Sequence, residues 1–277
     1  MNASKTKYTL SLVEKYLFLT SFALVSLFPL VWMLLNSFRN STEILSDPFG
    51  LPTSLDAINY YTVWVKGNMS SGFLNSLYVS LISVMLLIFV ATIAAYALAR
   101  MRDNLFLYAF FSLGIMIPAQ AILIPNFQIL RFLGLYNSHP GLILIYVTNN
   151  LTLAFFISYA FLRPLPKELE ESAFLDGASR VRAFRSIIFP LTMPAISTFA
   201  ILAFLNCWND YLMASIFITE KKMYTITMFI YTMMGEFSTN FGALFAGMGI
   251  AVLPVLLIYI FFQEQISKGM TGGAVKG

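Results

Sequence analysis

Long runs of apolar residues alternate with short polar segments along this chain. Six runs can each cross a hydrocarbon core about 30 Å thick, which takes about 20 residues of α-helix. Continuous runs predict helices, whereas a membrane β-barrel would show alternating segments of about ten residues. The pattern therefore predicts an all-α integral membrane protein with six transmembrane helices. They cover residues 16–37, 72–99, 105–130, 141–162, 193–217 and 243–262.

Composition supports this interpretation. Of the 277 residues, 58% are hydrophobic and 11% are charged, whereas a soluble domain carries about 25% charged residues. The polar segments are too short for a soluble module, so we expect a single membrane domain over residues 1–277. The 38–70 segment has turn residues and no predicted domain. The tail at 263–277 is rich in glycine and polar residues, which predicts disorder without a partner.

The basic residues are distributed unequally between the two sides of the predicted bundle. With six helices both termini lie on one side, and that side carries twelve of the 17 Lys and Arg residues. The positive-inside rule then places both termini and the 163–192 loop in the cytoplasm. The first helix is too long for a signal peptide and lacks an obvious cleavage site, so we expect a retained anchor. The net charge of +4 does not indicate nucleic-acid binding, because the charges follow membrane topology.

Two prolines interrupt the third predicted helix. Pro118 and Pro125 are seven residues apart, on nearly the same helix face, and each would remove a backbone hydrogen bond and kink the helix. Gln120, Asn126 and Gln128 lie around them. The segment is either a bent packing helix, whose freed carbonyls are satisfied by neighbours, or a bent helix that lines a cavity.

The loop at 163–192 predicts two short helices. Prolines and then acidic residues begin the first, where the helix dipole favours negative charge, and Gly177 ends it. Ser179 can cap a second helix with apolar residues at helical spacing. Neither helix has enough neighbours in the chain to bury its apolar face. The loop is either a docking surface for a cytoplasmic partner or an amphipathic segment on the lipid surface.

Other classes of function find little support in the sequence. Cys207 is the only cysteine and His139 the only histidine, so we expect no metal site and no catalytic residue. A secondary active transporter would place ionisable groups in mid-membrane, and more helices with pseudo-symmetry are usual. The chain has no clear group of this kind, and this carrier class remains the alternative.

The run from Glu170 to Pro194 resembles the EAA loop of binding-protein-dependent ATP-binding-cassette (ABC) permeases, in which E-A-A-x-x-x-G precedes I-x-L-P. Departures from that pattern are mild, with Ser172 for alanine and Phe189 for leucine. The resemblance covers nearly the whole chain and is closest to the second membrane subunit of maltose-type and multiple-sugar importers. The segments that carry it are Glu171-Ser172-Ala173, Gly177, Ile188-Phe189-Pro190, Met116 to Pro125, Trp208-Asn209-Asp210 and Lys268 to Gly277.

The resemblance implies a type I ABC importer permease fold, in which the 163–192 loop docks into a nucleotide-binding subunit. Glu171 would pair with a basic group there, and the tail would also reach the ATPase. The chain has no G-x-x-x-x-G-K-[ST] phosphate-binding loop, so it would not be an enzyme; ATP and Mg would be bound by the partner ATPase. The implied coupling residues are Glu171, Ser172, Ala173, Asp176, Gly177, Ala178, Phe184 and Pro190.

The resemblance also implies an assembly and a substrate. The expected partners are a second permease subunit, two ATPase subunits, an external sugar-binding protein and the lipid bilayer of a bacterial inner membrane. The implied substrate is a di- or oligosaccharide, with a polyol or glycerol phosphate as alternatives. The outer 218–242 loop is either a solvated connector or the segment that reaches into the binding protein. Its charged residues are Glu220, Lys221, Lys222 and Glu236.

Polar and aromatic residues of the fourth and fifth helices are candidates for the sugar pathway, because amides and carboxylates bind hydroxyls and aromatic faces stack on sugar rings. Asp210 lies about 24 Å along the helix from Pro194. It is therefore expected near the outer boundary of the membrane, where it is either a pathway residue or a solvated interfacial residue. Trp208 equally suits an interfacial aromatic belt or helix packing. The candidates are Asn149, Asn150, Asn206, Trp208, Asn209 and Asp210.

Overall fold

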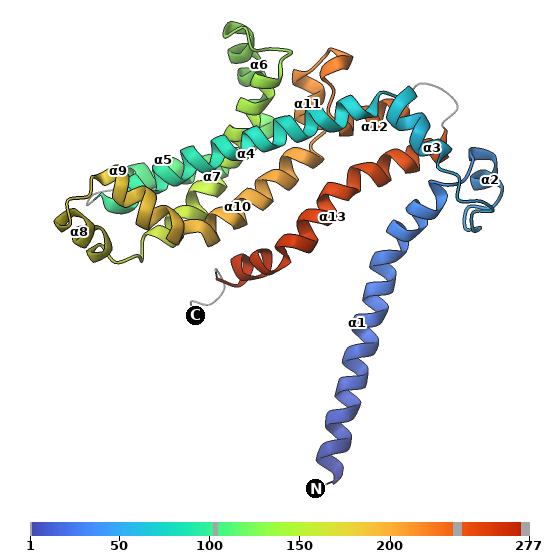
Figure 1. The fold of residues 1–277 in the computed structure, drawn as a ribbon, viewed down its shortest axis with the longest axis horizontal. Coiled ribbons are helices and arrows are strands. Elements are labelled where there is room, and N and C mark those ends of the chain that lie inside the picture. The colour runs from blue at the N-terminus through green and yellow to red at the C-terminus, as the bar shows by residue number, and fades with distance from the viewer. Residues whose placement is uncertain (1, 102–104, 235–239, 273–277) are drawn as a thin grey trace. The chain divides into compact units, whose positions relative to one another are not determined.

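The computed structural model describes residues 2–101, 105–234 and 240–272, and side chains within 12–264 of these ranges. All regular elements in this part of the chain are helices (Figure 1). They form two compact units, one of Met1–Ser70 with Ile230–Leu253 and the other of Ser71–Phe229 with Pro254–Gly277. The expectation of a single membrane domain over residues 1–277 stays a prediction.

Five helices are long and apolar enough to cross a membrane, and a bent helix pair makes a sixth candidate. The prediction of an all-α membrane protein with six spans is therefore confirmed for the described residues. The bent pair joins α5 (Leu105–Met116) to the segment Ala119–Phe132. The five long helices are α1 (Asn2–Asn36), α4 (Met69–Arg100), α7 (His139–Leu162), α10 (Phe189–Asn209) and α13 (Phe241–Gly272).

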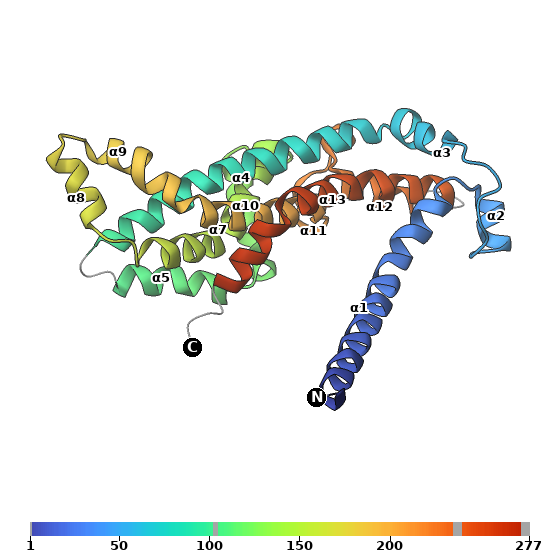
Figure 2. The ribbon, with the colours of Figure 1, turned by 60° about the horizontal axis from the view of Figure 1, so that its bottom comes forward.

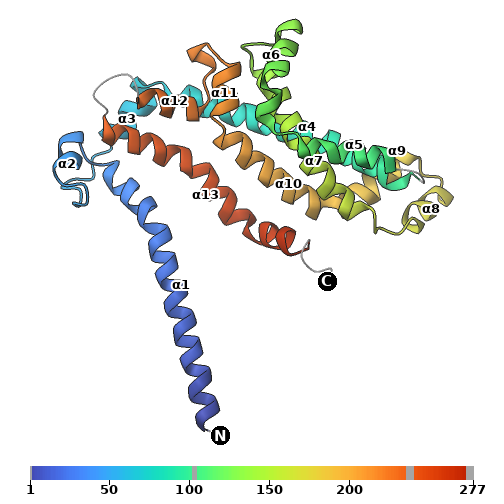
Figure 3. The ribbon, with the colours of Figure 1, turned by 180° about the vertical axis from the view of Figure 1, so that it is seen from behind.

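The third span is broken rather than kinked. After α5 the chain turns by 93° into the 3-10 helix η2 (Ala119–Ile122) and α6 (Leu123–Phe132), and Figure 3 shows α6 leaving the line of α5. Pro118 makes the break, with an extended backbone at ψ 136°. The expected kink at Pro125 is wrong, because this residue lies in the first turn of α6, where an amide hydrogen has no helical partner to lose.

The fifth span is shorter than predicted and ends at Asn209 instead of residue 217. Asp210 has an extended backbone, with ψ 131°, and its side chain accepts hydrogen bonds from the backbone N–H groups of Met213 and Ala214. These bonds cap a separate short helix, α11 (Leu212–Phe217). The apolar run continues through both helices, so a prediction from hydropathy alone treats α10 and α11 as one span.

The 38–70 segment is folded, contrary to its expected turn-like character. It contains α2 (Ser41–Ser46), α3 (Ile58–Tyr61) and a π-helical turn η1 (Thr62–Lys66). The buried Arg39 donates hydrogen bonds to the carbonyls of Glu43 and Asp47 and to the side chain of Asn36. A buried guanidinium with three acceptors organises this segment next to the end of α1 in the first unit.

In the second unit, α4, α7 and α10 share a hydrophobic core with the segments that follow α5 and α10. At one end, α7 leads into α8 (Glu168–Leu175), α9 (Arg180–Ala183) and the π-helical turn η3 (Phe184–Ile188), which continues into α10 (Figure 2). After α11 come η4 (Lys221–Met223) and α12 (Ile226–Met233). Residues 263–272 continue α13, so the predicted disorder is wrong there, and residues 273–277 lie outside the described part.

Candidate functional site

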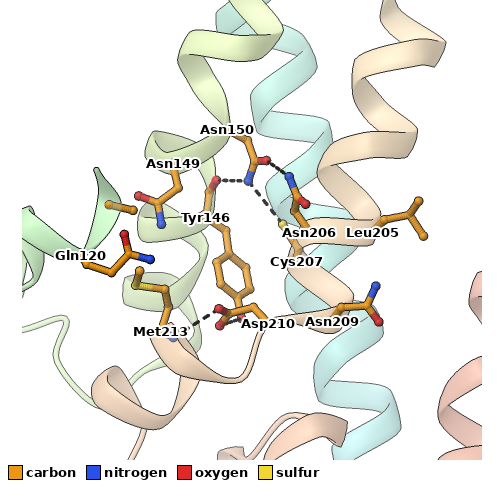
Figure 4. A pocket seen from close by; sticks show the side chains of 11 residues that line it. Gln120, Tyr146, Asn149, Asn150, Leu205, Asn206, Cys207, Asn209, Asp210 and Met213 are labelled. Carbon is orange, nitrogen blue, oxygen red and sulfur yellow. Dashed lines mark hydrogen bonds between the residues drawn. The ribbon is translucent and has the colours of Figure 1, made fainter. Parts of the chain in front are cut away.

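A pocket of about 540 Å³ lies in the second unit where α7, α10 and the break after α5 come together (Figure 4). Amide side chains dominate its polar lining, while Leu205 and Met213 are among its apolar members. Five of the six predicted pathway residues are brought together here. The lining residues are Ala119, Gln120, Tyr146, Asn149, Asn150, Leu205, Asn206, Cys207, Asn209, Asp210 and Met213.

One wall of the pocket is a fixed amide network between α7 and α10. The Asn150 amide is 8% exposed and donates to the carbonyl of Tyr146, 2.8 Å away. Its oxygen accepts a hydrogen bond of 3.0 Å from the Asn206 side chain. A buried amide with both ends in use orients its neighbours, so Asn150 sets the spacing of the two helices at the pocket.

Four amide side chains are exposed toward solvent and available to a ligand. Asn149 belongs to α7, Asn206 and Asn209 to α10, and Gln120 to η2. Figure 4 shows Gln120 and Asn149 facing the space in front of Tyr146. Because Gln120 reaches this pocket through the break at Pro118, the structure favours the cavity-lining interpretation of the third span.

Asp210 lines the pocket, but its carboxylate is largely occupied by protein donors. One oxygen accepts hydrogen bonds from the Tyr146 hydroxyl at 2.9 Å and from the Ala214 amide at 3.0 Å, and the other accepts from Met213. Its backbone carbonyl accepts a bond of 2.6 Å from the Thr227 hydroxyl. Asp210 therefore ties α10, α7, α11 and α12 together at the edge of the pocket.

Trp208 does not line this pocket, and its place in the predicted pathway stays a prediction. The side chain is 1% exposed and is stacked on Phe204, with ring centroids 5.7 Å apart. Phe73 on α4 meets it edge to face at 5.4 Å. The helix-packing interpretation applies, because successive residues of a helix point about 100° apart and Trp208 faces α4 instead of the cavity.

The 163–192 loop has the predicted two-helix form. Gly177 joins α8 to α9 with a positive φ of 82°, and the Ser179 hydroxyl caps α9 by accepting from the Arg182 amide. Two large apolar side chains of this loop are exposed to solvent, Leu175 at 89% and Val181 at 76%. An exposed apolar face on both helices fits either a protein partner or lipid.

The predicted coupling residues divide into exposed and covered groups. Ala173 is 9% exposed and buried within the chain, so its methyl group packs internally instead of facing a partner. Phe184 is half-buried against Tyr96 on α4, with ring centroids 4.9 Å apart. Ala178 is also half-buried. The exposed members are Glu171, Ser172, Asp176, Gly177 and Pro190.

Sequence reasoning missed the group that holds this loop in place. Glu170, the neighbour of the exposed Glu171, is 6% exposed, and its carboxylate contacts Tyr96 and Arg100 of α4. A basic residue at the end of an apolar run, four residues after an aromatic one, was the available signal. Three glutamates within one turn, at positions 168, 170 and 171, gave no indication of which one is buried.

The segment after α11 is attached to the rest of the second unit by hydrogen bonds and by buried side chains. Asn137 accepts hydrogen bonds from the amides of Thr219 and Glu220, and Ile226 and Phe229 are buried. The exposed Glu220 carboxyl has its pKa lowered by its contact with Lys222, with a further contribution from the Asn137 amide. Glu236, which the sequence also placed in this loop, lies outside the described residues.

The chain is similar to known membrane transport proteins over most of its length. The family model described as "binding-protein-dependent transport system inner membrane component" matches residues 88–272. The diacetylchitobiose uptake system permease protein of Streptomyces coelicolor is 34% identical over 92% of this chain and 85% of its own length. A probable starch degradation products transport permease of Thermoanaerobacterium thermosulfurigenes is 32% identical over 95% of this chain and 98% of its own.

A third relative and a solved structure agree with these matches. The multiple sugar-binding transport system permease protein of Streptococcus mutans is 31% identical over 95% of this chain and 96% of its own length. The fold resembles a chain of a bacterial ABC transporter that imports alginate, with a TM-score of 0.82 at 20% identity. That similarity covers 91% of this chain and 95% of the other, and it supports the fold.

Proposed function

Since this chain belongs to the family of binding-protein-dependent transport system inner membrane components, we propose that it forms one half of an ATP-driven sugar importer. The names of the three relatives mention diacetylchitobiose, starch degradation products and multiple sugars. A di- or oligosaccharide is therefore the substrate class we assign to this chain. A second permease subunit would complete the pathway, and an external binding protein would deliver the sugar.

The pocket between α7, α10 and η2 carries the substrate part of this proposal. Amides both donate and accept hydrogen bonds, as sugar hydroxyls do, and four exposed amides converge on it. Among the described residues that line the pocket, none is Lys or Arg. The phosphate of a glycerol phosphate is bound best by a Lys or Arg side chain, so the lining favours a neutral sugar.

The exposed part of the 163–192 loop is our candidate docking surface for the ATPase. Leu175 and Val181 offer apolar area, and the exposed Glu171 lies one turn before Leu175 on α8. Largely exposed leucine and valine side chains on successive short helices favour a protein cleft that covers them. In this arrangement ATP and Mg are bound by the partner, and this chain receives its movement.

The proposed orientation follows the distribution of positive charge. Arg180, Arg182 and Arg185 lie on α9 and η3, and Arg163 and Lys167 precede α8. An excess of Lys and Arg marks the cytoplasmic side of bacterial inner-membrane proteins. The docking surface would then face the cytoplasm, as an intracellular ATPase requires, and the pocket end of α10 would lie toward the outside.

Transport by the complete complex tests the function. Vesicles that contain this chain, its second permease subunit and the ATPase are supplied with the binding protein, ATP and a panel of labelled sugars plus glycerol phosphate. ATP-dependent uptake of a sugar is expected, and it should be lost in Glu171→Ala or Gly177→Pro while the binding protein still docks. Uptake without ATP, driven by an ion gradient, would return the chain to the secondary carriers.

A further inference from the structure

A buried polar cluster attaches the 163–192 loop to the end of α4. Tyr96 Oη donates to one carboxylate oxygen of Glu170 at 2.6 Å. Arg100 lies one turn further along α4, and its Nε and Nη2 lie 2.6 and 2.5 Å from the other oxygen. Both oxygens of the Glu170 carboxylate are therefore held by one helix face.

Tyr96 and Arg100 of α4 also contact the chain before α8 and after α9. Arg100 Nη1 donates to the carbonyl of Leu165, 3.3 Å away, in the turn before α8. The Tyr96 ring packs on Phe184 after α9. Because α4 holds the loop at its entry, its first helix and its exit, the loop cannot shift without moving this end of α4.

A second set of polar contacts fixes the opposite end of α4 to the outer segment. The Asn75 amide donates to the carbonyls of Lys222 and Tyr224 at 2.9 and 3.0 Å. The hydroxyl of Ser76 accepts from the Ile226 amide at 2.8 Å, at a site that is 3% exposed. Asn75 and Arg100 lie in one continuous helix, about 37 Å apart along its axis.

We propose that α4 is a rigid connecting rod between the 163–192 loop and the outer segment 222–226. Tyr96, Arg100 and Glu170 act as positioning residues at its inner end, and Asn75 and Ser76 act at its outer end. Displacement of the loop by the ATPase then moves the outer segment through α4, without a separate signal along the pocket helices. The inference rests on the proposed transport function, because it needs a partner that displaces the loop.

The geometry of these polar contacts explains why these residues, and not a general hydrophobic contact, fix the loop to α4. An ion pair with two further hydrogen bonds resists sliding as well as separation, since its geometry is directional. Removal of one partner from a buried pair leaves an uncompensated charge. Glu170→Gln therefore lowers the stability of the protein and also weakens the attachment of the 163–192 loop to α4. The test must separate these two effects.

The experiment uses the complete transporter in vesicles and measures sugar uptake and ATP hydrolysis per assembled complex. Glu170→Gln is compared with Glu168→Gln, which removes an exposed carboxylate from the same helix turn. Tyr96→Phe is the milder inner variant, which keeps the ring on Phe184. Asn75→Ala removes the outer contact. We expect uptake per ATP to fall at least about fivefold in Glu170→Gln and in Asn75→Ala, with hydrolysis retained.

Three results would overturn the rod. Uptake and hydrolysis that fall together, in proportion to assembled complex, would show that the cluster serves stability alone. An unchanged ratio of uptake to hydrolysis in Tyr96→Phe and Asn75→Ala would show that neither end transmits movement. A loss in the Glu168→Gln control equal to that in Glu170→Gln would assign the effect to charge. If the unaltered complex takes up no sugar at all, the proposed function fails instead.

Discussion

The hydroxyl of Tyr146 on α7 donates a hydrogen bond of 2.9 Å to the carboxylate of Asp210, the first residue after α10. This bond joins the two helices that supply most of the pocket. The same carboxylate caps α11, so one side chain determines where α10 ends, where α11 begins and how α7 lies against both.

Loss of the Asp210 carboxylate should destabilise the protein more than it alters sugar recognition. Asp210→Ala removes a helix cap and leaves the Tyr146 hydroxyl without its acceptor, at a cost of about 2–4 kcal/mol. Asp210→Asn keeps an oxygen for the cap and should recover part of this loss. Thermal unfolding of the purified complex measures both. An Asp210→Asn protein of normal stability that transports nothing would show that the carboxylate binds substrate.

The exposed amides of the pocket should contribute to the apparent affinity for sugar. Asn209→Ala and Gln120→Ala each remove hydrogen bonds worth about 0.5–1.5 kcal/mol, which corresponds to a two- to tenfold increase in the KM of uptake. Leu202→Ala, at an exposed position of α10 outside the pocket lining, is the matched control. Equal KM values in all three proteins would move the substrate pathway away from this pocket.

Two glycines with the same unusual backbone permit a controlled test of the 163–192 loop. Gly177 has φ +82° and Gly134 has φ +68°, and an added Cβ would meet nothing within 4 Å at either site. Alanine therefore costs about 1–2 kcal/mol of backbone strain at both positions. We expect Gly177→Ala to reduce ATP-dependent uptake and Gly134→Ala to leave it unchanged. If the two variants lose uptake equally, the loop has no special role.

Trp208 should behave as a packing residue. Trp208→Ala would open a cavity between α4 and α10 and destabilise the protein by about 3–5 kcal/mol. Trp208→Phe keeps an aromatic ring between Phe73 and Phe204 and should cost less. The relative uptake rates of different sugars should remain the same in Trp208→Phe, measured with the labelled panel. A changed order of uptake rates among the sugars would show that the Trp208 indole takes part in sugar recognition.

The continuous spans were predictable because hydropathy and length suffice to identify them. Helices α1, α4, α7 and α13 follow uninterrupted apolar runs. The predicted ranges lie inside the observed helices for α4, α7 and α13, and the range for α1 extends one residue past Asn36. The break after Met116 and the end of α10 at Asn209 were not predictable in this way. Both depend on backbone conformations, at Pro118 and Asp210, within runs that stay apolar on either side.

The pocket and the loop show a similar division between residue type and residue position. The amides within the spans pointed to a polar cavity, and five of the predicted residues line it. Trp208 lies outside the pocket lining, because periodicity gives spacing along a helix but not which face meets the cavity. Glu170 was missed for the opposite reason, since three glutamates in one turn are equivalent until a partner such as Arg100 is placed.

The break at Pro118 has a consequence for water inside the bilayer. Helix α5 has 12 residues and is about 18 Å long, too short for a hydrocarbon core of about 30 Å. The non-helical backbone at Ile117 and Pro118 would therefore lie at membrane depth, where lipid cannot satisfy peptide groups. Water in the pocket beside Gln120 is the natural partner for them. Deuterium should consequently replace the amide hydrogens of Ala119 and Gln120, which begin η2, much faster than those in the middle of α7.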